Sequence, residues 1–179
     1  MSENLRSLAK KHAEHTRERV AEEAQRYDDR GEVPLPGYAG SLTAFALAVT
    51  AVAAAGRRSG RGLPERYGLS DIALGALATH KFSRLLSKGS VTSPIRAPFT
   101  EFQEPAGSAE LNERARGGRV RHTVGELLSC PFCLGQWVGT GYVAGLGLAP
   151  RPTRAWAAVF AVTALSDTLH QVYARLRDD

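Results

Sequence analysis

The sequence predicts an all-α fold: a helical integral membrane protein of about four transmembrane helices, with three as the alternative and a polar helix at the N-terminus. Two observations predict this class. Residues 127–149 are 23 amino acids without an Asp, Glu, Lys or Arg, and a helix of that length crosses a hydrocarbon core of roughly 30 Å. Charge is also segregated: residues 1–34 carry 15 of the 41 acidic and basic side chains, whereas residues 38–56 carry none.

The chain is predicted to divide into a charged tail, residues 1–37, and a membrane domain, residues 38–176. Residues 2–30 are rich in helix-forming Ala, Glu, Lys and Arg, with a narrow apolar stripe typical of a solvated helix. They lack the apolar core of a secretory signal. The Pro-Leu-Pro-Gly run at 34–37 is expected to end this segment.

Four segments of the membrane domain are predicted to span the bilayer. Their bounds are 38–56, 69–87, 127–149 and 155–176. The second and fourth carry charged side chains, which neighbouring helices would have to accommodate. Residues 88–126 form a polar connection, in which Val91–Phe99 is predicted to be ordered and extended. Arg96 in that stretch could meet a lipid phosphate or a helix C-terminus, and the favoured interpretation is a surface connector.

The distribution of positive charge predicts the topology. With four spans, the tail, the 88–126 connection and the C-terminus share one side and carry 15 Lys and Arg, while the two short connections on the other side carry 6. Positive charge favours the cytoplasm. We therefore expect a multi-pass protein of the cell membrane with both termini cytoplasmic; with three spans this asymmetry disappears.

Cys130-Pro131-Phe132-Cys133 is the motif with the most chemical content. At the start of a helix the side chains at i and i+3 face the same way, which suits a redox thiol pair or two ligands of a zinc site. Zinc takes four ligands, and the four-span arrangement would bring further candidates to the same depth. The candidate thiol or metal cluster is Cys130, Cys133, His80, Asp167 and His170. The alternative is that the cysteines only pack between helices.

Other residues are predicted to fix helix packing. Two GxxxG pairs on the third segment allow close helix approach: Gly135 with Gly139, and Gly141 with Gly145. Asp167 is expected to pair with His80 or Lys81, and Asp71 with an arginine of the 57–66 loop.

Several blocks of the sequence resemble a known family. They are Ala78-Thr79-His80-Lys81, Arg84-Leu85-Leu86, the Val91–Phe99 stretch, Glu126 with the Cys130–Cys133 motif and Trp137, and Ser166-Asp167. Together they resemble the bacterial membrane family called domain of unknown function 1360 over residues 70–175. The resemblance implies a multi-span membrane protein, some relatives being sporulation-associated, and it implies no catalytic residue.

The leading hypothesis is a non-catalytic scaffold or assembly factor in the bacterial membrane. The alternative is a thiol-redox or metal-binding membrane protein that uses Cys130 and Cys133 at the cytoplasmic face, with zinc as the candidate metal. No Walker, GxGxxG, HExxH or GxSxG motif points to an enzyme. The expected partners are the lipid bilayer and a second copy or another membrane protein. The net charge of +5 lies at the edges of apolar segments, so nucleic acid is not expected.

Overall fold

The computed structural model describes residues 2–30 and 33–178 and is mostly helical. The helices are α1 (Ser2–Tyr27), α2 (Leu35–Arg58), α3 (Leu69–Lys88), α4 (Ser93–Arg96), α5 (Arg119–Ser129), α6 (Pro131–Leu148) and α7 (Pro150–Asp178), with a 3-10 turn η1 (Ser90–Thr92) before α4. Two strands, β1 (Thr100–Gly107) and β2 (Glu110–Ala115), form an antiparallel hairpin. The prediction of an all-α fold is therefore wrong in this respect.

The chain separates into two compact units, residues 1–39 and residues 40–179. The first contains α1, an almost fully exposed helix as expected of the charged tail. After α1, the side chain of Asp28 accepts a hydrogen bond from the backbone N–H of Val33 at 2.6 Å. The next helix begins at Leu35, with Pro36 in its first turn, where the missing N–H of proline costs nothing.

In the second unit, α6 and α7 pack on α3. The centre of the packing consists of small and aromatic residues: Ala78, Tyr142, Leu146 and Ala157 are buried, with Leu74, Trp156 and Phe160 against them. Ala78 and Ala157 are both 0 % exposed. The hydroxyl of Tyr142 donates to the backbone oxygen of Asp71 at 2.8 Å. From α2, Phe45 meets Trp137 of α6 edge to face, with ring centroids 5.1 Å apart.

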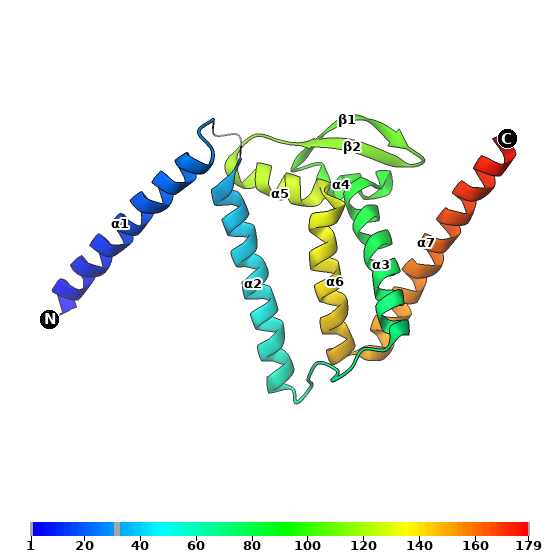
Figure 1. Cartoon of the computed structure of the whole chain (residues 1–179), viewed down its shortest axis with the longest axis horizontal. Helices are drawn as coiled ribbons and strands as arrows, with labels where there is room; N and C mark the ends of the chain where they lie inside the picture. The colour runs from blue at the N-terminus through cyan, green and yellow to red at the C-terminus, as the bar shows by residue number, and fades with distance from the viewer. Residues whose placement is uncertain (1, 31–32, 179) are drawn as a thin grey trace. The chain divides into compact units, whose positions relative to one another are not determined.

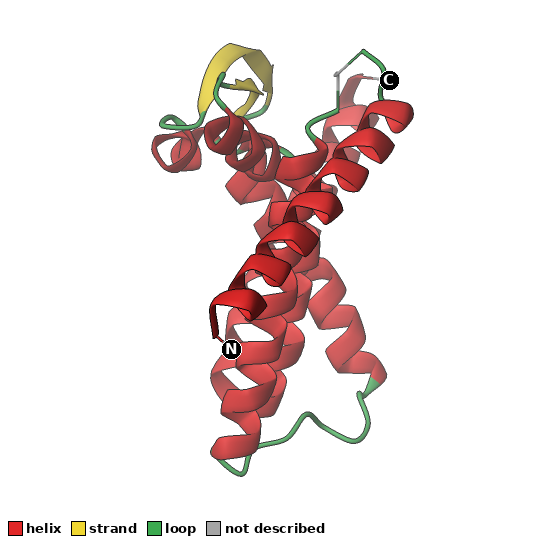
Figure 2. Cartoon of the chain, turned by 90° about the vertical axis from the view of Figure 1, so that its left-hand side faces the viewer, coloured by secondary structure: helices red, strands yellow, loops and turns green. Residues whose placement is uncertain are grey.

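The hairpin lies at one end of these helices, beside the C-terminal end of α3 and the N-terminal end of α6 (Figures 1 and 2). The 57–68 loop and the junction of α6 with α7 lie at the other end (Figure 1). α5 packs on β2. Gly125 makes this contact close, because a Cβ atom there would lie 2.9 Å from Cβ of Ala115 on β2.

The predicted span at 127–149 is not one helix. The chain breaks at Cys130, where the extended backbone (φ −102°, ψ 108°) ends α5 and precedes α6. Proline at 131 explains the break, because it disfavours helical geometry in the residue before it and suits the first turn of a new helix. The polar connection 88–126 is likewise more structured than predicted: Val91–Phe99 forms a helical turn rather than an extended segment.

Among the described residues, only α2 is both long and apolar enough to cross a membrane by length and composition. The prediction of about four transmembrane helices is therefore not supported by composition. α3 and α7 carry charged side chains, and the break at Cys130 leaves α6 with 18 residues, fewer than the 23 of the predicted span. The helices themselves are close to the predicted ranges: 69–87 matches α3, and 155–176 lies within α7.

Candidate functional site

Arg96, at the end of α4, is the most deeply buried charged side chain, with 0 % of its surface exposed. Its Nη1 donates to the backbone oxygen of Leu86 at 2.7 Å, and its Nη2 donates to that of Gly89 at 3.0 Å. Both oxygens belong to the C-terminal end of α3, where the last carbonyls have no partner within the helix. Arg96 therefore caps α3 and places positive charge at the negative end of its dipole.

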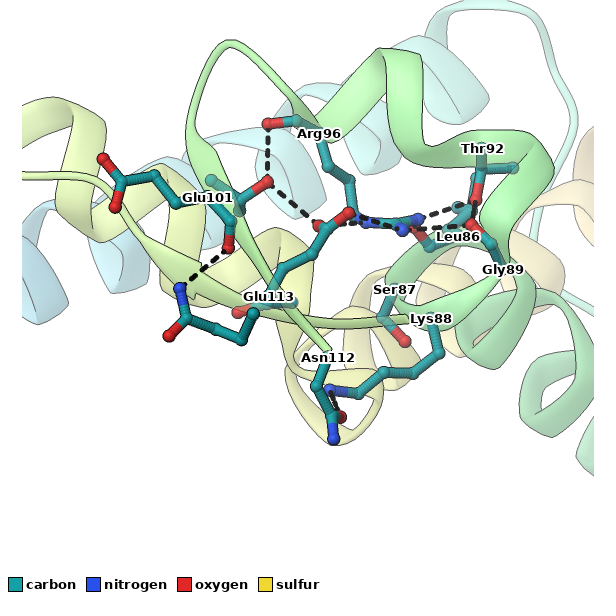
Figure 3. Close-up of polar contacts among 12 residues, drawn as sticks. Leu86, Ser87, Lys88, Gly89, Thr92, Arg96, Glu101, Asn112 and Glu113 are labelled. Atoms are coloured by element: carbon teal, nitrogen blue, oxygen red, sulfur yellow. Dashed lines mark hydrogen bonds and ion pairs between the residues drawn. The ribbon is translucent and has the colours of Figure 1, made fainter. Parts of the chain in front are cut away.

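Glu113 of β2 and Thr92 take up the remaining donors of Arg96 (Figure 3). The Nε of Arg96 donates to Oε2 of Glu113 at 2.7 Å, and Nη2 donates to Oε1 at 3.0 Å. Nη1 also donates to Oγ1 of Thr92 at 2.7 Å. All five guanidinium N–H groups are thus used. The hydroxyl of Thr100 donates a further hydrogen bond to Oε2 of Glu113 at 2.9 Å.

The Glu113 carboxyl is ionised although its side chain is only 5 % exposed. Burial alone favours the protonated form. Hydrogen bonds from Arg96 and Thr100, with attraction to Arg96 and Lys88, outweigh burial and hold the pKa of Glu113 below its usual value of 4.5. The Arg96–Glu113 pair therefore joins α3, α4 and the hairpin. It has no donor left for a ligand, which makes its role structural.

The tip of the hairpin is attached to α3 separately. Arg84 donates two hydrogen bonds of 2.7 Å to the carboxylate of Glu110. The backbone N–H of Ser90 donates to the oxygen of Ala109 at 2.9 Å, and Ala109 has a positive φ of 60° in the turn. Attachment at both the base and the tip fixes the hairpin as a platform over the end of α3.

The charges of α3 and α7 are matched across the helix contact. Lys81 pairs with Asp167, which confirms the prediction that Asp167 pairs with His80 or Lys81. Asp71 accepts two hydrogen bonds from Arg154, at 2.7 and 2.9 Å. The prediction of a partner in the 57–66 loop is therefore wrong. The sequence could not favour Arg154, because only the parallel arrangement of α3 and α7 brings their first turns together.

The two cysteines lie at the junction of α5 and α6 and are both free thiols. Cys130 is the residue before α6, and its Sγ accepts a hydrogen bond from the backbone N–H of Cys133 at 3.3 Å. Cys130 thus caps the helix as a serine would. Cys133 is exposed on the first turn. The thiol-redox alternative stays a prediction.

The other members of the predicted cluster lie on α3 and α7. His80 is exposed on α3 and lines a groove of about 690 Å³ with Pro131 and Phe132. His170 is exposed on α7, and Asp167 is engaged with Lys81. Within the described part of the chain, no three His, Cys, Asp or Glu side chains form a group that could hold a metal ion. The zinc hypothesis therefore has no support in these residues.

The glycines of α6 differ in their surroundings. A Cβ atom at Gly135 or Gly139 would lie 3.9 or 3.7 Å from Cγ2 of Thr79 on α3, and one at Gly145 would lie 2.6 Å from Oγ1 of Thr153 on α7. A Cβ at Gly141 would meet nothing within 4 Å. The closest approach involves Gly75 of α3, where a Cβ would lie 2.2 Å from the ring of Tyr142. No sequence motif marks Gly75, so this contact cannot be predicted from the sequence.

The contact of Arg96 with Glu113 is not among the predictions, although the sequence holds one signal for it. Arg96 is constrained between two prolines, and a constrained arginine needs a fixed acceptor. The alternation of side chains in a strand would then point to the acidic residues of 101–113. The predicted contact of Arg96 with a helix C-terminus is correct. The favoured interpretation, a connector on the surface, is wrong because the Arg96 side chain is buried.

The fold and these contacts can now be set beside known proteins. Residues 74–173 match the family described as "Protein of unknown function (DUF1360)". The chain belongs to this family. The matched region contains the Arg96–Glu113 pair, the hairpin and the cysteines, but not α2. The chain is 38 % identical over 69 residues to "Sporulation protein YjcA" of Bacillus subtilis (strain 168), which is 37 % of this chain and 58 % of that protein. The chain thus spans just over half the length of this relative. No solved structure matches the chain.

Proposed function

We propose that this chain is a multi-pass protein of the cell membrane and acts as a non-catalytic scaffold, with the hairpin platform as its fixed surface outside the bilayer. The observation that carries the proposal is an inverted distribution of side-chain size. The buried positions of α3 and α7 hold small residues, whereas large apolar side chains of α7 point outward. The outward set on α7 is Val159, Val162, Leu165, Leu169, Val172, Tyr173 and Leu176.

This distribution is typical of helices packed within lipid. Lipid tails solvate leucine and valine as well as a protein interior does, so close backbone approach at small residues stabilises the bundle instead. On α3 and α7 the buried small residues are Ala78, Ser83, Ser87, Ala157, Ala161 and Ala164. Large exposed apolar surfaces otherwise mark a protein interface, which is the competing explanation for α7.

The ion pairs support the same proposal. Four of the charges on α3 and α7 form two pairs across the helix contact, Lys81 with Asp167 and Asp71 with Arg154. Paired charges are the form in which ionisable residues are tolerated inside membranes. α3 has 20 residues and α6 has 18, lengths of about 30 and 27 Å that approach the thickness of a hydrocarbon core.

The scaffold role rests on the rigid attachment of the hairpin. The strand β1 is exposed over most of its length, including Phe102, while β2 carries the side chains that hold it to α3. A fixed surface with an exposed edge suits the binding of another protein. The related protein's name refers to sporulation and names no reaction.

Insertion and topology can be tested together. In a C130S/C133S background, single cysteines replace Ser59 in the 57–68 loop or Ser108 at the hairpin turn. We expect the chain to stay in the membrane after an alkaline carbonate wash. We also expect an impermeant maleimide to label S59C from outside the cell and S108C only after lysis. Release by carbonate would refute the membrane proposal, and labelling of both positions from one side would refute a multi-pass arrangement.

A further inference from the structure

A groove of about 390 Å³ lies between α2 and α6, at the end away from the hairpin. Its walls are mostly apolar, formed by Val49, Val52, Ala53, Thr140, Val143, Ala144, Gly147 and Leu148, and its mouth is lined by Arg57 and Arg61. Between Val49 and Arg57 the helix rises about 12 Å. The volume lies within the range of about 300–1,000 Å³ usual for small-molecule sites.

The turn that ends α2 holds the two arginines at this mouth. The backbone N–H of Arg61 donates to the oxygen of Gly56 at 2.9 Å, and that of Gly60 donates to Arg57 at 3.3 Å. Gly60 has a φ of +65°. This is the Schellman arrangement, in which a glycine in the left-handed region closes the helix. A Cβ at Gly56 would lie 2.8 Å from the oxygen of Arg61, so the small residue lets the turn fold back onto the helix.

The loop after this turn closes the end of the groove. A Cβ atom at Gly147 of α6 would lie 2.9 Å from the backbone oxygen of Gly62 and 3.3 Å from Cα of Leu63. The loop therefore rests directly on α6 because residue 147 is glycine. The loop end of the groove is thus set by a backbone contact with α6.

Arg57 and Arg61 have no acidic partner in the part of the chain that the structure describes. Among the described residues, neither guanidinium forms an ion pair or donates a hydrogen bond. Two other arginines of this unit, Arg84 and Arg154, each hold a carboxylate in a two-bond pair. An apolar groove with two uncompensated guanidinium groups at its mouth complements a molecule with one anionic group and an apolar chain, since guanidinium binds phosphate through paired N–H groups.

We propose that this groove binds one anionic phospholipid, with its phosphate between Arg57 and Arg61 and the first part of an acyl chain along α2 and α6. The proposal rests on the membrane insertion proposed above. The mostly apolar walls decide in favour of a lipid rather than a free phosphate, because apart from Thr140 they consist of Val, Ala, Gly and Leu side chains, which give a small anion no hydrogen bond. The bound lipid would hold α2 against α6, which the Phe45–Trp137 contact also joins.

The test uses the full chain in vesicles of phosphatidylglycerol and phosphatidylcholine, followed by extraction into detergent and native mass spectrometry of retained lipid. We expect the wild type to retain phosphatidylglycerol and R57Q/R61Q to retain about tenfold less, as expected for lost charge-assisted hydrogen bonds. The matched control R58Q/R66Q removes the same charge outside the groove and should behave as the wild type. A144F, which fills the groove and keeps both arginines, should also lose the lipid.

Three results would overturn the groove. The first is that R57Q/R61Q retains as much phosphatidylglycerol as the wild type, and the second is that R58Q/R66Q loses as much of it as R57Q/R61Q. The third is that inorganic phosphate or glycerol phosphate displaces the phosphatidylglycerol while the lipid stays in excess. Flotation of wild type and variants with the vesicles reports insertion independently. If the wild type fails to float, the membrane proposal is refuted. In that case, binding of short-chain phosphatidylglycerol to the chain in detergent micelles tests lipid binding by the groove separately.

Discussion

Arg96 and Glu113 are 17 positions apart in the sequence, on α4 and β2, and their side chains meet through two hydrogen bonds of 2.7 and 3.0 Å with almost no contact with solvent. Removing one partner leaves a buried charge without compensation, which costs about 3–5 kcal/mol. We expect R96A and E113A each to lower the free energy of unfolding by that amount and to increase hydrogen exchange across residues 100–115.

The exposed pair Arg114–Glu101 provides the matched control for that experiment. It lies on the same hairpin with an N–O distance of 3.5 Å and both side chains largely exposed. R114A should therefore cost no more than about 1 kcal/mol. Equal losses for R96A and R114A would contradict the structural role given to Arg96.

Acid is expected to loosen the hairpin through Glu113. Its pKa in the folded protein is lowered from 4.5, so the unfolded state binds the proton more readily. The stabilisation is complete above pH 4.5 and is lost as the pH falls through the lower, folded pKa. Hydrogen exchange of residues 100–115 measured from pH 6 to pH 3 should rise below about pH 4.5 after correction for intrinsic rates. E113Q should remove this component of the pH dependence.

Gly75 is expected to tolerate no larger residue. A Cβ there would lie 2.2 Å from the Tyr142 ring, and overpacking of this kind costs about 1–3 kcal/mol. G75A should lower the thermal midpoint, and G75A/Y142L should recover part of it. The control G141A adds a methyl group where nothing lies within 4 Å, so it should be neutral or stabilise the helix by up to about 1 kcal/mol. A stable G75A protein would show that α3 and α6 are not held at this separation.

The cap at Cys130 predicts different outcomes for two similar substitutions. Serine can accept the hydrogen bond from Cys133 N–H, whereas alanine cannot. C130A should therefore lower the free energy of unfolding by about 1 kcal/mol relative to C130S, measured by denaturant unfolding in detergent. C133A serves as the control and should resemble C133S, since the exposed thiol caps nothing.

The ion pairs between α3 and α7 predict that reversing both charges of a pair restores the stability that either single reversal removes. K81D and D167K each bring like charges together, and the double variant K81D/D167K re-forms the pair in reverse. We expect each single variant to destabilise the protein by about 1 kcal/mol in detergent, where both groups are partly solvated, and the double variant to recover most of it. Additive losses would show that the two side chains do not interact.

The sequence predicted the helices better than the connections between them. Apolar composition and bounding Pro, Gly and Arg residues placed α2, α3 and α7 to within a few residues, because helix formation there follows local composition. The hairpin escaped prediction because its strands are charged and lack an apolar face, and they are held by Arg96 and Arg84 from outside. Such contacts leave no periodic pattern.

The candidate site shows the same limit. The uncharged run across Pro131 favours one long span, and the capping role of Cys130 follows only from the break that the structure shows there. The sequence predicts His80 or Lys81 as the partner of Asp167, and the structure shows Lys81. Arg154 could not be named for Asp71, because the choice depends on which helices run side by side.

The dependence of the hairpin on α3 also sets an order of assembly during synthesis. A two-stranded hairpin is marginally stable by itself, and this one is anchored to carbonyl groups at Leu86 and Gly89. Those groups leave the ribosome before Arg96, and Arg96 leaves before Glu113. Each residue therefore emerges after the partner it needs, so the platform can close on a finished helix end before α6 and α7 have been made.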